Sequence, residues 1–231
     1  MNIKHIHKTT LIDFPGQIAS TIFVSECNFN CNFCYNSSLI EINNAIPSIP
    51  QEEAIAFLNN RKHLIDGIAI TGGEPTLQKD LIPFLNKIRE LGLKIKIDTN
   101  GYKPEVLAKI LEHSLADYIA MDIKASFSKY SQVANKEINI KKIAESIEIL
   151  MASTIEYEFR TTVWNNYFNQ IKAEELLAPI KKAKNYYLHN YVNPDKNSES
   201  TFYPMPKNQI TPILDIAKKL INNVQLRGNW Y

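Results

Sequence analysis

Six short apolar runs recur along the chain, and helix-like segments separate them. The runs are residues 18–25, 67–71, 94–98, 117–122, 155–163 and 185–191. Several of these runs are too uniformly apolar for a sheet with one solvent-exposed face. This pattern predicts strands that are covered on both faces. We therefore expect a sheet of parallel strands joined by helices.

The segments between the runs carry helix signals of their own. In the last of them, Thr211 followed by Pro212 predicts an N-cap and a first helical residue, so a helix is expected to begin there. Apolar residues at helical spacing mark the expected helices in the ranges 81–88, 106–111, 140–150, 176–180 and 213–220.

Strand–helix alternation with right-handed crossovers predicts an α/β fold. Six such units favour an incomplete parallel (βα)6 barrel that is open on one side. Parallel barrels carry their chemistry on loops at the C-terminal ends of the strands. Residues 192–208 are rich in Pro, Asn and Ser and predict a long loop. The length fits one domain over residues 1–231.

Composition and charge narrow the classes of function. The chain is 45% hydrophobic and 22% charged, which suffices for a sizeable core. Its 26 basic and 24 acidic residues leave a net charge of +2, without the basic surplus of a dedicated nucleic-acid binder. Neither a membrane-spanning run nor an apolar signal segment is visible. We expect a cytoplasmic protein with no nucleic-acid or membrane partner.

All three cysteines lie within eight positions, in the stretch CNFNCNFC. They are Cys27, Cys31 and Cys34. An odd cluster of thiols in a reducing compartment favours metal binding or catalysis over disulfides. Small buried hydrophobes, or a zinc site completed by His5, His7 or His189, are the weaker alternatives. Four-iron clusters usually take four cysteines, so three would leave one iron open to another ligand.

The spacing C-x3-C-x-aromatic-C, with Phe33 before the third cysteine, resembles the signature of radical S-adenosylmethionine (SAM) enzymes. The resemblance implies that the three cysteines hold a 4Fe-4S cluster whose fourth iron binds SAM. In that family the reduced cluster cleaves SAM to methionine and a 5′-deoxyadenosyl radical, which abstracts hydrogen from a substrate. The stretch begins where the first predicted strand ends, so the cluster loop is expected at the barrel mouth.

A Gly-Gly turn follows the second predicted strand, in TGGEP at residues 71–75. Such a pair fits an ordinary strand–helix turn, but glycine also lets the backbone approach a ligand closely. The resemblance implies that Gly72, Gly73 and Glu74 contact the amino group of SAM.

The third and fourth predicted strands end in DTNG and MDIK. The resemblance implies that Asp98 and Thr99 help to hold SAM and a monovalent cation, and that Asp122 and Lys124 contact its ribose and carboxylate. Asp122 and Lys124 share one strand face because they are two positions apart. Unpaired charges inside a barrel are costly, so we expect a ligand to be their partner.

Arg160 lies in the apolar run 155–163. A guanidinium can bind a carboxylate through two hydrogen bonds, and the resembled family carries an Arg near the cofactor here. A salt bridge to a neighbouring carboxylate, such as Glu156 or Glu158, is an equally open interpretation.

Segments over nearly the whole chain resemble activating proteins of anaerobic ribonucleoside-triphosphate reductases. They are 8–16, 57–78, 96–107, 117–125, 157–163 and 224–228. The resemblance implies one radical SAM core domain over residues 1–231, a glycyl radical enzyme as partner, and a one-electron donor such as flavodoxin or ferredoxin. The alternatives are a radical SAM enzyme for a small molecule or peptide, as in deazapurine synthesis, and a non-catalytic iron–sulfur electron carrier.

The chain departs from the resembled pattern at three positions in and beside the cysteine stretch. Glu26 stands where the family usually has Gly, Asn30 where it usually has Arg, and Tyr35 where it usually has His. None of these changes removes a predicted cluster ligand, so they bear on the subfamily and the partner.

Overall fold

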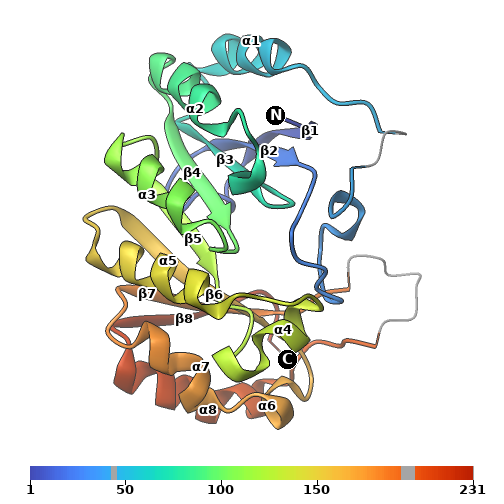
Figure 1. Cartoon of the computed structure of the whole chain (residues 1–231), viewed down its shortest axis with the longest axis vertical. Coiled ribbons are helices and arrows are strands. Elements are labelled where there is room, and N and C mark those ends of the chain that lie inside the picture. Colours follow the sequence, from blue (N-terminus) through green and yellow to red (C-terminus); the bar gives the residue numbers. More distant parts are fainter. Residues whose placement is uncertain (43–45, 194–200, 231) are drawn as a thin grey trace.

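Within the described residues, eight strands form one sheet in which neighbours along the chain are neighbours in space (Figure 1). The computed structural model describes residues 1–42, 46–193 and 201–230. The strands are β1 (Ile3–Thr10), β2 (Ala19–Val24), β3 (Gly67–Gly72), β4 (Lys94–Thr99), β5 (Tyr118–Asp122), β6 (Glu156–Val163), β7 (Asn185–Asn190) and β8 (Asn223–Arg227). The pair β1–β2 is antiparallel, and every later pair is parallel.

The curved sheet leaves one side open, between the β1 and β8 ends of the strand order. The predicted incomplete parallel barrel is therefore confirmed. All six predicted strands are present, as β2 to β7. The sequence-based prediction missed β1 and β8 because neither contains an apolar run. β1 has two isoleucines among eight residues, and β8 alternates Val224 and Leu226 with polar residues.

Helices cover the outer face of the sheet (Figure 1). They are α1 (Gln51–Arg61), α2 (Leu81–Glu90), α3 (Pro104–Glu112), α4 (Tyr130–Ala134), α5 (Ile140–Ala152), α6 (Tyr167–Gln170), α7 (Ala173–Leu177) and α8 (Lys207–Leu220). The apolar stripe of α2 is fully buried at Leu81, Phe84, Leu85 and Ile88. Each such side chain stabilises the fold by about 1.5–3 kcal/mol relative to exposure.

Alternation along the strands separates an apolar outer layer from a polar barrel interior. On β6, Tyr157, Phe159 and Val163 belong to the apolar core beneath the helices. The intervening Glu158 and Arg160 form ion pairs with residues of other strands. The interior of the barrel is thus built for charged groups.

Two local predictions differ from the structure. The helix expected to start at Thr211 starts four residues earlier, at Lys207, and Pro212 lies inside it. The Thr211 hydroxyl donates to the Lys207 carbonyl at 2.9 Å, within the helix rather than as a cap. A loop was predicted over residues 192–208. Residues 194–200 of it lie outside the described residues, and residues 207 and 208 belong to α8.

In the part of the chain that the structure describes, no helix combines the length and the apolar character needed to cross a membrane.

Candidate functional site

One cavity of about 220 Å³ gathers every residue that the sequence predicted for the site. It lies at the C-terminal ends of the parallel strands, where the chemistry of such barrels was expected. The predicted residues that line it are Cys27, Cys31, Phe33, Cys34, Gly72, Gly73, Glu74, Asp98, Thr99, Asp122, Lys124 and Arg160. Residues from five separate segments of the sequence therefore meet in one place.

The cysteine loop leaves β2 and is tied down by its own backbone. The amide of Cys27 donates to the Ile40 carbonyl at 2.9 Å, and the amide of Cys34 donates to the Cys31 carbonyl at 3.1 Å. The Cys27 sulfur accepts the amide of Phe29 at 3.4 Å. All three thiols are free and face the same cavity.

Burial shapes the acid–base chemistry of these thiols. It raises the pKa of Cys27 to about 12, with a further contribution from Glu74, and the pKa of Cys31 to about 11. Both thiols therefore stay protonated at neutral pH until a bound cation compensates the thiolate charge, so metal binding must release protons.

The donor set suits an iron–sulfur cluster. Three sulfur ligands come from one loop and share one partly apolar cavity, and each cysteine of a four-iron cluster binds a different iron. Among the described residues, no three His, Cys, Asp or Glu side chains converge on a point that would hold a single metal ion. Of the histidines considered for zinc, His189 lines the cavity, whereas His5 packs beside Phe23 on β2.

Close packing of the backbone explains why both residues of the Gly-Gly turn lack a side chain. A Cβ on Gly72 would lie 2.4 Å from the Val24 carbonyl oxygen, and one on Gly73 would lie 2.3 Å from the Glu26 carbonyl oxygen. The amides of Gly73 and Glu74 donate to those same two carbonyls, at 2.7 and 2.8 Å. The turn after β3 therefore clamps the start of the cysteine loop.

Glu74 is buried, and protein groups occupy both of its carboxylate oxygens. Oε1 accepts the Thr76 amide at 3.1 Å and the Thr99 hydroxyl at 2.8 Å, while Oε2 accepts the Asn100 amide at 2.6 Å. Burial raises the pKa of Glu74, and these hydrogen bonds oppose the rise. The carboxylate thus joins the turn after β3 to the end of β4.

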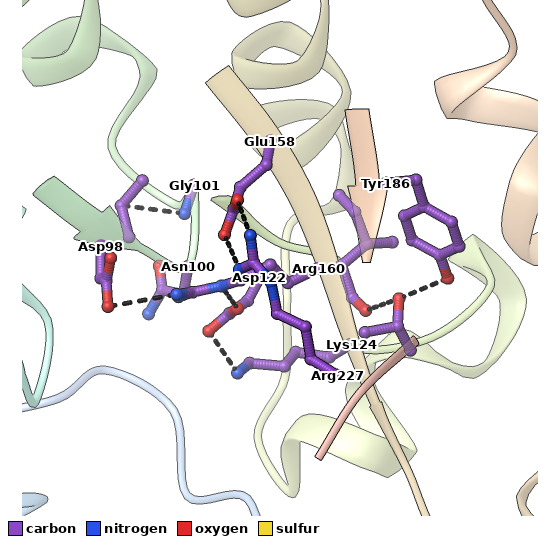
Figure 2. A network of polar contacts seen from close by, with 12 residues as sticks. Asp98, Asn100, Gly101, Asp122, Lys124, Glu158, Arg160, Tyr186 and Arg227 are labelled. Atoms are coloured by element: carbon purple, nitrogen blue, oxygen red, sulfur yellow. Dashed lines mark hydrogen bonds and ion pairs between the residues drawn. The ribbon is translucent and has the colours of Figure 1, made fainter. Parts of the chain in front are cut away.

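The charged residues form a chain of ion pairs through the barrel (Figure 2). Arg160 binds Asp98 at 3.2 Å and Asp122 at 2.8 Å, and Lys124 binds the other oxygen of Asp122 at 2.9 Å. At the Asp98 end of this chain of ion pairs, Lys96 also pairs with Asp98. Burial disfavours ionisation of Asp98 and Asp122, but Arg160 and the lysines outweigh it and lower the pKa of both carboxyls.

This arrangement corrects one expectation and identifies the partners in another. Asp122 and Lys124 are each other's partners, so the argument that they need a ligand for charge balance is wrong. Arg160 does form salt bridges, but with Asp98 and Asp122 instead of Glu156 or Glu158. Glu158 is held instead by Arg227, at 2.7 and 2.8 Å, and by the Tyr118 hydroxyl at 2.7 Å.

Two further residues of the cavity wall were either missed by the sequence-based prediction, as Asn100 was, or considered only for zinc, as His189 was. Asn100 donates to the Asn28 side chain at 2.9 Å and lies 3.9 Å from the Cys27 sulfur. His189 lies near the C-terminal end of β7, and its Nε2 is buried with no hydrogen-bond partner in the described part of the chain. Burial lowers the pKa of His189 to about 4, which keeps it neutral. Asn100 and His189 both lie at or near the C-terminal end of a strand, and this position was the signal in the sequence that could have placed them in the cavity.

Comparison with known proteins identifies the family. Residues 21–170 match the model of the radical SAM superfamily, which is more than half of the chain. The chain belongs to the radical SAM superfamily. It is a radical SAM enzyme, and the family implies SAM and a 4Fe-4S cluster as cofactors.

The relatives of this radical SAM chain have different activities. A protein of Methanocaldococcus jannaschii, provisionally named a glycyl-radical enzyme activating enzyme, is 33% identical over 97% of this chain and 95% of its own length. The 7-carboxy-7-deazaguanine synthase of Clostridium acetobutylicum is 28% identical over 80% of this chain and 90% of its own.

A solved structure shares the fold. SuiB of Streptococcus suis bound to S-adenosylmethionine superposes with a TM-score of 0.61 over 89% of this chain, at 17% sequence identity. This chain spans 49% of that protein's length.

Proposed function

We propose that this protein activates a glycyl radical enzyme, with anaerobic ribonucleoside-triphosphate reductase as the partner. The observation that carries the proposal is the end-to-end match to the Methanocaldococcus jannaschii protein, which covers 97% of this chain and 95% of that one. A match over nearly the whole of both sequences favours a shared activity, and the relative's name gives a glycyl radical enzyme as its target. The hydrogen donor would then be a glycine on a loop of that partner protein.

A bound cluster would supply the one electron that SAM cleavage requires, and the resulting radical would take a hydrogen atom from the glycine. Cys27, Cys31 and Cys34 would hold the cluster. A one-electron donor protein, a flavodoxin or a ferredoxin, would reduce it.

The ion-pair chain would orient SAM. Burial opposes protonation of Lys124, but Asp122 outweighs it and raises the pKa of the ammonium, so Lys124 stays charged and can bind the SAM carboxylate. Asp122 would bind the ribose, and Arg160 fixes this carboxylate from its other side. Because each group is held by its neighbour, the site is preorganised and binding loses little side-chain freedom.

The remaining predicted residues complete the pocket. Gly72, Gly73 and Glu74 would receive the SAM amino group, and Phe33, packed 4.6 Å from the Trp164 ring, would form an apolar wall. Asp98 and Thr99 would hold a monovalent cation beside SAM.

The test uses one anaerobic sample. Iron-reconstituted protein is mixed with a reductant, SAM and an anaerobic ribonucleotide reductase, and the sample is assayed for a glycyl radical doublet and for 5′-deoxyadenosine. We expect both signals. The nucleoside without the doublet would keep the radical chemistry and reject the partner. The absence of both signals, with the cluster shown to be loaded, would reject the activase function.

A small-molecule substrate is the second candidate. The match to 7-carboxy-7-deazaguanine synthase, over 90% of that enzyme, favours it. The same sample distinguishes the two, because a small-molecule enzyme forms 5′-deoxyadenosine only slowly until its own substrate is added, and it forms no doublet on the reductase.

A further inference from the structure

Tyr35, directly after the third cysteine, reaches across to the end of β7. Its hydroxyl donates to the Asn190 carbonyl at 3.2 Å and accepts the Val192 amide at 3.1 Å. Its ring stacks on Tyr191, with centroids 5.8 Å apart and an angle of 16° between the planes. A hydroxyl can donate and accept at once, so a single oxygen makes both bonds.

These contacts join parts of the fold that the sheet does not join. β2, which leads into the cysteine loop, and β7 are separated by four strands in the sheet order. The two hydrogen bonds link residues 155 and 157 positions apart in the sequence. Tyr35 therefore fastens the cysteine loop to the C-terminal half of the barrel.

The anchor at the end of β7 is itself rigid. The Asn190 side chain is buried, and its Nδ2 donates to the carbonyls of Met205 at 3.0 Å and Asn229 at 2.7 Å. Its Oδ1 accepts the amide of Met205 at 2.7 Å. The carbonyl that Tyr35 binds thus belongs to a residue held by three further hydrogen bonds.

The rest of the cysteine loop is attached to α4 and to the end of β3. The amide of Asn30 donates to the Ala134 carbonyl at 2.9 Å, and the Asn36 side chain donates to the Gly72 carbonyl at 3.1 Å. On the β7 side, the aromatic packing of Phe33 and the contacts of Tyr35 hold the loop. The polar part of that attachment is the hydroxyl of Tyr35.

We propose that Tyr35 is a positioning residue that fastens the Cys34 end of the cysteine loop to the end of β7. The loop conformation that presents Cys34 to the cavity then exists before iron and SAM arrive. Tyr35 is 41% exposed and lies at the mouth of the site, so the fastening can open without unfolding the core. This inference goes beyond the proposed function and needs no partner enzyme.

The first measurement is deuterium exchange in the iron-free protein. Tyr35→Phe keeps the stacked ring and removes only the hydroxyl. We expect exchange in peptides covering residues 31–36 and 190–193 to become about tenfold faster, which corresponds to about 1.4 kcal/mol, while other peptides stay unchanged. The matched control is Tyr203→Phe, since Tyr203 is 59% exposed and lies in the segment beside Met205.

The second measurement uses the iron-loaded enzyme. If the loop is in its binding conformation only part of the time, the apparent affinity for SAM falls by that fraction. For Tyr35→Phe we expect the KM for SAM in 5′-deoxyadenosine formation to rise about three- to tenfold, with kcat within twofold. Unchanged exchange at residues 31–36, or exchange that accelerates equally in all peptides, would overturn the proposal. A loss of kcat at constant KM would also overturn it.

Discussion

Glu26 adopts a backbone conformation that normally belongs to glycine, and this leads to a sharp prediction. Its φ is +83°, and it precedes the first cysteine. The residue cannot relax, because its amide donates to the Leu39 carbonyl at 2.8 Å and its carbonyl accepts the Glu74 amide at 2.8 Å. A residue with a Cβ loses about 1–2 kcal/mol in the left-handed region.

Glu26→Gly should therefore stabilise the iron-free protein. Relief of about 1–2 kcal/mol is partly offset by about 0.5–1 kcal/mol for the greater flexibility of glycine in the unfolded chain. The net gain is about 0.5–1 kcal/mol, or a rise in Tm of about 1–4 °C for a domain of this size. Urea unfolding should show a higher midpoint with an unchanged slope.

Two further variants separate backbone strain from charge. Glu26→Ala removes the exposed carboxylate but keeps the Cβ, so its stability should stay within about 0.5 kcal/mol of the parent. Gly73→Ala would place a Cβ 2.3 Å from the Glu26 carbonyl oxygen and should destabilise by about 1–3 kcal/mol. If Glu26→Ala gains as much as Glu26→Gly, or if Glu26→Gly gains nothing, the strain argument is refuted.

Three other predictions concern the cofactor cavity. Cys31→Ala should abolish the intact cluster, and unchanged iron content with an unchanged electron resonance signal would contradict its role as a ligand. Lys124→Ala should weaken SAM binding about ten- to hundredfold, the usual effect of a lost charge-assisted hydrogen bond, at unchanged iron content; equal binding of SAM by parent and variant would remove Lys124 from the site. The pKa values of Asp98 and Asp122 are lower in the folded state than in the unfolded state, so ionisation of these carboxyls stabilises the fold. This stabilisation is fully present above pH ~4, where unfolded aspartates are ionised, and it declines as the pH falls toward the folded pKa values. Urea midpoints between pH 6 and pH 3 should therefore fall in the parent and fall less in Arg160→Gln, and parallel profiles would contradict the ion-pair reading.

The sequence by itself determined six of the eight described strands and the location of the chemistry. Apolar runs without alternation can only be satisfied between two layers, so β2 to β7 were predictable as buried parallel strands. Parallel strands present their C-terminal ends at one edge, which is why Cys27, Gly72, Asp98 and Lys124 could be expected to meet. These conclusions follow from local pattern and from the geometry of strand–helix units.

The tertiary structure decided which groups pair. Glu74, Asp98 and Asp122 each had a candidate ligand role from the sequence, yet the fold supplies protein partners to all three. Hydrogen bonds and ion pairs between distant segments depend on angles and separations that no local pattern encodes. The same holds for Tyr35, whose bonds to the end of β7 exist only because the barrel brings the two strand ends together.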